Sequence, residues 1–218
     1  ISDLVTFLAE DTRLRQRFGT SPLYVETRFG IRKPGRKSWP PAEYSIPEIG
    51  TLKFRGIIDR IDVDPDNKKA LIIDYKTGKY SANKTLESDP LGRGEHLQLP
   101  VYALALRGAL GFEIQLRIAY WFISNKGKFR VIPSNPPTDE EVSESFAKTL
   151  STIASGIKTG IFPANPGPSQ SSNRSWTNCR FCDFDSLCSS RRDIFWKRKK
   201  ESDPRIKSYV NLSEGRIP

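Results

Sequence analysis

Residues 54–78 read "FRGIIDRIDVDPDNKKALIIDYKTG", with two apolar runs on either side of "DPDN". Apolar runs separated by a short turn-forming segment are typical of a β-hairpin. A two-residue turn at Asp66-Asn67 pairs residues whose numbers sum to 133, which places Asp59 directly across from Asp74, with Cβ atoms about 5 Å apart. A longer turn would shift this register by one residue.

Two like charges opposed in an apolar hairpin are unfavourable unless something positive lies between them or one acid stays protonated. Lys76 points to the same face as Asp74 and offsets one charge. A divalent cation would offset both, and carboxylate oxygens are the ligands that Mg²⁺ prefers. Such a cation polarises a phosphoryl oxygen and lowers the pKa of a bound water. The Lys76 ammonium beside it would orient that water or stabilise the developing charge.

"GIIDRID" followed by "LIIDYKTG" resembles the PD-(D/E)XK nuclease superfamily, specifically its RecB/AddB type, over about residues 20–190. The resemblance implies an α/β fold with a restriction-endonuclease-like core, in which helices flank a mixed central β-sheet. It also implies Asp59 and Asp74 as ligands of Mg²⁺ or Mn²⁺, the backbone carbonyl of Tyr75 as a further ligand, and Lys76 as the catalytic lysine. The alternative is that these acids are salt-bridged residues of an edge strand.

Other residues extend the resemblance. Glu26 in "YVETRFG" matches a strand Glu that often approaches the metal in this family; the alternative is an ordinary surface Glu. Arg60 and Asp62 share the hairpin signature, and we expect them to support the site rather than to perform chemistry.

The predicted helix that follows the hairpin carries two polar residues on one face. Gln98 and Tyr102 in "HLQLPVYALAL" are four residues apart, which places them together on a helix. The resemblance implies that they approach DNA at the edge of the active site; the alternative is a half-exposed helix face. His96, the only histidine, is expected to be a cap or surface residue.

The N-terminus departs from the family pattern. The family usually carries a His on a helix before the first strand, and residues 1–25 contain none. Either that element precedes Ile1 or the site is weakened. The sequence also begins without Met and contains none, so we expect a fragment or a chain with trimmed ends.

The composition favours a soluble, anion-binding protein. The 218 residues are 37% hydrophobic, enough for a core, and no apolar run approaches the ~20 residues that a membrane span needs. The formal net charge is +10, which favours nucleic acid as a partner, solubility alone being the alternative. Eight Lys and Arg with interleaved aromatic residues lie in 189–207, as on a phosphate-binding surface or a solvated helix face.

A Pro- and Ser-rich linker over 162–176 divides the chain into two predicted domains. We expect a nuclease core over 1–161 with a truncated N-terminal helix, and a Cys-containing helical appendage with a basic tail over 162–218. Within the core the pattern predicts helices at 2–18, 96–110 and 138–157 (the last capped by Thr138), strands at 22–30, on both sides of the hairpin turn, at 113–124 and at 129–133, and a loop with one short strand at 31–50.

The appendage contains the only three cysteines: Cys179, Cys182 and Cys188, spaced C-x₂-C-x₅-C. This spacing suits a metal that needs four ligands in total. AddB-like nucleases complete such a trio with a distant N-terminal Cys around a 4Fe-4S cluster, so the resemblance implies a cluster whose fourth ligand is not in this chain. Zinc with His96 or water, and free structural thiols, are the alternatives.

These observations predict a metal-dependent deoxyribonuclease acting on single strands or ends of DNA. By resemblance, its setting is double-strand-break repair beside a helicase, in the bacterial cytoplasm at the nucleoid. A DNA-binding module with an inactive nuclease centre is an alternative from another class. A CRISPR-associated end-processing nuclease is a third hypothesis.

Overall fold

The computed structural model describes residues 2–32, 34–35, 37–64, 66, 68–111, 113–137, 140–170, 175–180 and 182–216, with backbone only at 81–84, 140–142, 170 and 175. The chain forms two compact units, residues 1–150 and residues 151–218.

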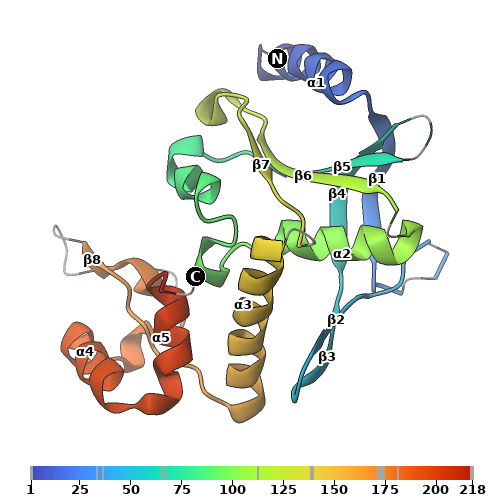
Figure 1. The fold of residues 1–218 in the computed structure, drawn as a ribbon. Helices are drawn as coiled ribbons and strands as arrows, with labels where there is room; N and C mark the ends of the chain where they lie inside the picture. The colour runs from blue at the N-terminus through green and yellow to red at the C-terminus, as the bar shows by residue number, and fades with distance from the viewer. Residues whose placement is uncertain are drawn as a thin grey trace. The chain divides into compact units, whose positions relative to one another are not determined.

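The first unit is built on a five-stranded sheet with the order β1-β4-β5-β6-β7 (Figure 1). The strands are β1 (Ser21–Phe29), β4 (Gly56–Val63), β5 (Lys69–Lys76), β6 (Gln115–Phe122) and β7 (Val131–Ser134). Strands β5 and β6 are parallel, and the other neighbours are antiparallel. The parallel pair needs a crossover, which helix α2 (Gln98–Leu110) supplies. This mixed sheet with flanking helices confirms the predicted fold class.

The pairing of β4 with β5 has the predicted register. Arg60 lies opposite Ile73 and Ile61 opposite Ile72, so partner numbers sum to 133. The backbone N–H of Asp64 donates to the carbonyl of Lys69 at 3.1 Å, which closes the ladder at the turn. The expected turn residues are only partly described, because Pro65 and Asn67 lie outside the described residues.

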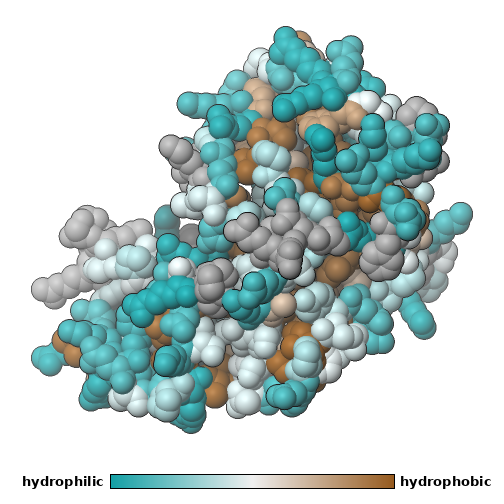
Figure 2. Space-filling model, in the orientation of Figure 1, coloured by the Kyte–Doolittle hydropathy of each residue, from teal (hydrophilic) through white to brown (hydrophobic). Residues whose placement is uncertain are grey.

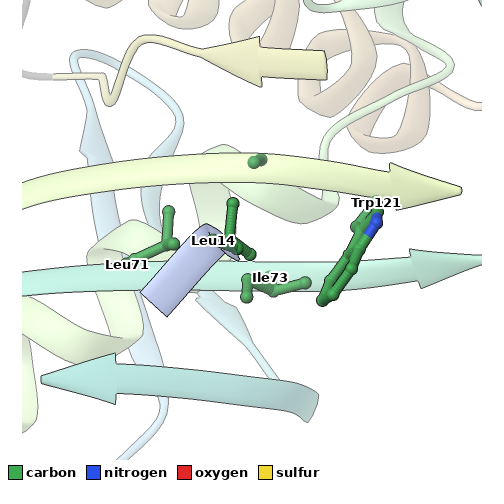
Figure 3. Close-up of a cluster of buried hydrophobic side chains, with 5 residues drawn as sticks. Leu14, Leu71, Ile73 and Trp121 are labelled. Atoms are coloured by element: carbon green, nitrogen blue, oxygen red, sulfur yellow. The ribbon is translucent and has the colours of Figure 1, made fainter. Parts of the chain in front are cut away.

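Successive residues of a strand point to opposite faces, so the sheet has two different surfaces. Helix α1 (Ser2–Phe18) covers one of them, where Leu14 packs on Leu71, Ile73, Ala119 and Trp121 (Figure 3). Helix α2 packs against β5 and β6 on the other face, which carries Ile72, Asp74 and Lys76. We call these the α1 face and the α2 face.

The segment 31–50, predicted as a loop with one short strand, contains the strand β2 (Ala42–Ile46), which pairs with an unpredicted strand that follows it, β3 (Gly50–Phe54). The prolines that indicated a loop stand just outside the strand, at positions 40, 41 and 47. Ala42 and Ile46 are buried, and the ring of Tyr44 packs edge-on against Phe146. The alternation of Ala42, Tyr44 and Ile46 was therefore the stronger signal.

The remaining elements of the first unit follow the expected order. The segment 80–94 contains two 3₁₀ turns, η1 (Tyr80–Glu87) and η2 (Gly92–Gly94), and a third, η3 (Asn125–Gly127), lies between β6 and β7. Helix α3 (Glu140–Thr159) runs across the boundary between the units. Its expected cap, Thr138, lies outside the described residues.

The second unit is built from short elements: β8 (Ser169–Gln170), β9 (Ser175–Trp176), η4 (Thr177–Cys179), η5 (Asp185–Leu187), α4 (Arg192–Ser202), η6 (Pro204–Ile206) and α5 (Lys207–Ser213). Two contacts join its helices: Trp196 meets Tyr209 edge-on, and Lys200 pairs with Glu214 at 2.5 Å. These helices beside the cysteines match the predicted helical appendage.

The surface agrees with a mean hydropathy of −0.51. The face drawn in Figure 2 is mostly hydrophilic, with hydrophobic side chains in scattered patches. In the part of the chain that the structure describes, no helix combines the length and apolar character needed to cross a membrane.

Candidate active site

The hairpin brings the two predicted acids together. Continuing the register of β4 and β5 by one pair places Asp59 opposite Asp74, so both side chains lie on the α2 face. The backbone N–H of Tyr75 donates to Oδ2 of Asp59 at 2.9 Å, which fixes one acid against the strand of the other. Lys76 Nζ lies 2.6 Å from Oδ2 of Asp74. The three residues therefore form one cluster at the end of β5.

Asp74 is in an unfavourable place for a negative charge. Its residue is only 2% exposed. Burial raises the pKa of Asp74, the nearby charge of Asp59 raises it further, and the ion pair with Lys76 opposes both effects. Desolvation disfavours the ionised form of an acid, so this site gains from an additional positive charge.

Helix α2 contributes the two polar residues that its sequence suggested. Nζ of Lys76 donates to Oε1 of Gln98 at 3.0 Å, so Gln98 contacts the cluster directly. Burial raises the pKa of Tyr102 to about 12, helped by the charges of Asp74 and Asp59, while a hydrogen bond with Gln98 opposes the rise. At neutral pH the Tyr102 phenol therefore keeps its proton and remains a hydrogen-bond donor.

Gly56, the first residue of the hairpin signature, makes room for this arrangement. A Cβ atom added at Gly56 would lie 2.9 Å from Cζ of Phe29, too close for carbon atoms. The Phe29 ring in turn packs edge-on against Tyr102, with ring centroids 6.0 Å apart. Glycine at this position therefore allows the aromatic contact that supports Tyr102.

Glu26 lies on β1, next to the site. Its neighbours pair as Val25 with Arg60 and Thr27 with Ile58, so the register places Glu26 opposite Asp59. The residue is exposed and has a φ of +48°, which is uncommon for a residue other than glycine. Its charge contributes to the raised pKa of Tyr102. A metal-binding role for Glu26 stays a prediction.

His96 was expected to be a cap or surface residue, but it packs close to the site. It is half-buried, its ring packs edge-on against Tyr120, and the Lys76 ammonium lies 4.9 Å from the centroid of the same Tyr120 ring. Burial lowers the pKa of His96, and the charge of Lys76 lowers it further. His96 is therefore mainly neutral at pH 7.

The α1 face of the same hairpin carries a second ionic cluster. Arg60 contacts Asp62 through two hydrogen bonds and also reaches Asp11 of helix α1 and the hydroxyl of Tyr75. Asp11 was not among the site residues predicted from the sequence. The signal was present, because Asp11 stands four residues after Phe7 and three before Leu14, on the apolar face of the helix.

The residues on the α2 face suit a divalent cation by their chemistry. Oδ2 of Asp74 is buried, and no well-aligned hydrogen bond reaches it from the described residues, although the Lys76 ion pair does. Two carboxylates against one ammonium leave the face negative. Within the described ranges no group of three or more His, Cys, Asp or Glu side chains could hold a metal. Backbone carbonyls and water would therefore have to complete the coordination, as they often do for Mg²⁺.

In the second unit, Cys179, Cys182 and Cys188 are free thiols, the first half-buried and the others exposed. The guanidinium of Arg192, on α4, pairs with Asp185 and lies over the ring of Trp176. These contacts attach helix α4 to the cysteine segment.

Helix α4 presents a basic outer surface. Lys197, Arg198 and Lys199 are exposed, and so are Ile194 and Phe195. The Arg198 guanidinium lies 5.1 Å from the centroid of the Phe195 ring. We call these five residues the α4 basic surface.

The chain resembles known proteins over much of its length. The family model described as PD-(D/E)XK nuclease superfamily matches residues 1–189. The gene 69 protein of Mycobacterium phage D29 is 28% identical over 188 residues, which cover 80% of this chain and 60% of that protein. One subunit of the ATP-dependent helicase/deoxyribonuclease of Desulforudis audaxviator (strain MP104C) is 43% identical over 83 residues, which cover 37% of this chain and 6% of that subunit.

The chain thus spans less than two thirds of the length of either relative. The family match, in contrast, includes the whole sheet, the hairpin with its opposed acids and the cysteine segment. The chain belongs to the PD-(D/E)XK nuclease superfamily.

Proposed function

We propose that this chain is a metal-dependent deoxyribonuclease domain that hydrolyses phosphodiester bonds in single strands or ends of DNA. The observation that supports this most is the cluster on the α2 face, where Asp59, Asp74 and Lys76 lie together at the end of β5. Membership of a nuclease superfamily agrees with this chemistry.

Each residue has a distinct part in the proposed reaction. Asp59, Asp74 and the backbone carbonyl of Tyr75 would hold Mg²⁺ or Mn²⁺, which when bound polarises the phosphoryl oxygen and lowers the pKa of a bound water. Lys76, already held between Asp74 and Gln98, is placed to orient the attacking water or to stabilise charge on the phosphate. Gln98 and Tyr102 would contact the DNA strand beside the scissile phosphate.

The test is degradation of linear DNA by the purified chain with Mg²⁺ or Mn²⁺. We expect cleavage that EDTA abolishes and that Lys76→Ala lowers by about 10²–10³-fold, as loss of one electrostatic stabiliser usually does. Lys69→Ala is the matched control, because Lys69 is an exposed lysine at the other end of β5. Cleavage that ignores both EDTA and Lys76→Ala would refute the proposal.

A second candidate is a DNA-binding module without nuclease activity, which the α4 basic surface favours. In that case the chain would bind DNA in EDTA but would not cleave it with any divalent cation. For either function we expect Lys197→Gln with Arg198→Gln to reduce the slope of log affinity against log salt concentration by about 0.7–0.9 for each lost phosphate contact. An unchanged slope would exclude the α4 basic surface from DNA binding.

We also propose that the three cysteines contribute to a 4Fe-4S cluster. For this the thiols would have to come closer together than in the described part of the chain, where no group of three such side chains could hold a metal. The support is the C-x₂-C-x₅-C spacing in the second unit, beside the basic helix. A fourth ligand other than these cysteines is needed, and zinc is the competing occupant. Iron and zinc content after anaerobic purification, with Cys182→Ser as the control, distinguishes the two metals from metal-free thiols.

The biological setting is proposed from the relative that belongs to a helicase/deoxyribonuclease. A helicase that unwinds an end would supply the single strand that the site cleaves, as in double-strand-break repair. The test is whether an added helicase makes degradation of blunt duplex DNA by this chain dependent on ATP. Equal degradation with and without ATP would argue against such a partner.

A further inference from the structure

The ionic cluster on the α1 face lies directly behind the proposed active site. Its centre is Arg60, 5% exposed, between Asp62, fully buried, and Asp11, 9% exposed. Nε and Nη2 of Arg60 donate to the two oxygens of Asp62 at 2.5 and 2.6 Å, and Nη1 donates to Oδ1 of Asp11 at 2.5 Å. Arg15 also donates to Asp11, at 2.9 Å, so two positive and two negative charges balance.

The same Arg60 guanidinium reaches the residue that separates Asp74 from Lys76. Nη1 donates to the hydroxyl of Tyr75 at 3.1 Å. The Tyr75 ring packs edge-on against Phe7 at 6.0 Å and tilted against Trp121 at 5.8 Å, and these two rings stack on each other at 4.9 Å. The side chain of Tyr75 therefore has little freedom on the α1 face.

The backbone of Tyr75 acts on the opposite face. Its N–H donates to Oδ2 of Asp59, one of the two opposed acids. Because residues 74, 75 and 76 are consecutive in one strand, a shift of Tyr75 displaces Asp74 and Lys76 as well. Tyr75 thus connects the α1-face cluster to all three proposed active-site residues.

We infer that Arg60, Asp11, Asp62 and the Tyr75 hydroxyl are positioning residues, which set the geometry of the metal-binding acids through the Tyr75 backbone. The inference rests on the proposed metal-dependent nuclease function. It adds that helix α1, through Asp11, is coupled to the site although it covers the other face of the sheet. Groups that orient metal ligands in this indirect way commonly contribute about tenfold or more to metal affinity.

The test compares three single variants. Tyr75→Phe removes only the hydroxyl, and Asp11→Asn removes one charge from the cluster with little change of size. Glu10→Gln is the matched control, because Glu10 is the neighbouring acid on α1 and pairs with the exposed Arg13. Mn²⁺ binding is measured by titration calorimetry without DNA, cleavage is measured against Mn²⁺ concentration, and thermal unfolding shows that each variant is folded.

We expect Tyr75→Phe and Asp11→Asn to weaken Mn²⁺ binding by about tenfold, with cleavage at saturating Mn²⁺ within about threefold of the wild type. Glu10→Gln should behave as the wild type in both measurements. A lower unfolding temperature with unchanged Mn²⁺ affinity would overturn the inference, because it shows a purely structural cluster. Failure of the wild type itself to bind Mn²⁺ and to cleave would instead refute the proposed function.

Discussion

The two faces of one β-hairpin use similar charged residues in opposite ways. On the α1 face, Arg60 and Arg15 balance Asp11 and Asp62, and every one of these groups has a partner. On the α2 face, two acids oppose each other with Lys76 as their cation, and a buried carboxylate oxygen lacks a well-aligned hydrogen bond. A satisfied network specifies structure, whereas an unbalanced one stores a cost that a ligand can relieve. From this difference we propose that the α2 face binds a ligand and that the α1 face supports it.

The largest expected effect comes from breaking the balanced face. Burial alone would lower the pKa of Arg60, but hydrogen bonds with Asp62, Tyr75 and Asp11 outweigh it and keep the guanidinium charged. Arg60→Ala leaves Asp62 buried without its partner, so we expect the free energy of unfolding to fall by about 3–5 kcal/mol. Urea denaturation measures this. Arg13→Ala, at an exposed arginine, should change the free energy of unfolding by less than about 0.5 kcal/mol. An equally small effect of Arg60→Ala would show that the α1-face cluster does not stabilise the fold.

Removing a charge from the α2 face should not lower the free energy of unfolding, in contrast to Arg60→Ala. In the metal-free protein, Asp74→Asn removes a buried charge that faces Asp59, at the loss of a partly exposed ion pair with Lys76. We expect the free energy of unfolding to stay equal or to rise by up to about 1 kcal/mol, while cleavage is abolished. The sign follows from the raised pKa of Asp74: protonation favours the folded state, so its contribution is present at low pH and is lost as the pH rises through the folded-state pKa. A clear loss of stability in urea would mean that Asp74 is a structural acid.

The smallest expected effect concerns the strand beside this face. A left-handed backbone costs a residue other than glycine about 1–2 kcal/mol, and Glu26 has a φ of +48°. Glu26→Gly relieves this strain but adds freedom to the unfolded chain, so the net gain should be no more than about 1 kcal/mol. If Glu26 also contributes to the metal site, the same variant requires more Mn²⁺ for half-maximal cleavage. Glu26→Gln, which keeps the strain and removes the charge, separates the two effects.

The α2 face was predictable from sequence because strand pairing follows a simple arithmetic rule. Once "DPDN" was taken as the turn, the facing of Asp59 and Asp74 and the side of Lys76 followed from the two-residue period. The helix spacing predicted only that Gln98 and Tyr102 share a face, and the family resemblance implied that this face lies at the edge of the site.

The α1 face was not predictable in the same way. Its contact between Asp11 and Arg60 spans 49 positions, and no local pattern specifies such a partner, although Arg60 and Tyr75 are diagonal neighbours in the same hairpin. The β2–β3 hairpin was only partly predicted, because one short strand was expected within 31–50 and its partner β3 was not. Prolines at 40, 41 and 47 indicated a loop, but they lie outside the paired residues, where they cost the ladder no hydrogen bond.

The central claim is that the acids of the α2 face hold a divalent cation. It is tested most directly by Mn²⁺ titration calorimetry of the wild type, Asp74→Asn and Asp64→Asn in the absence of DNA. Asp64 is the control, because its carboxylate accepts a hydrogen bond from the backbone N–H of Lys69 at the turn and does not belong to the proposed metal site. We expect a binding site in the wild type and in Asp64→Asn that is lost in Asp74→Asn. Indistinguishable titrations for the wild type and Asp74→Asn would contradict it.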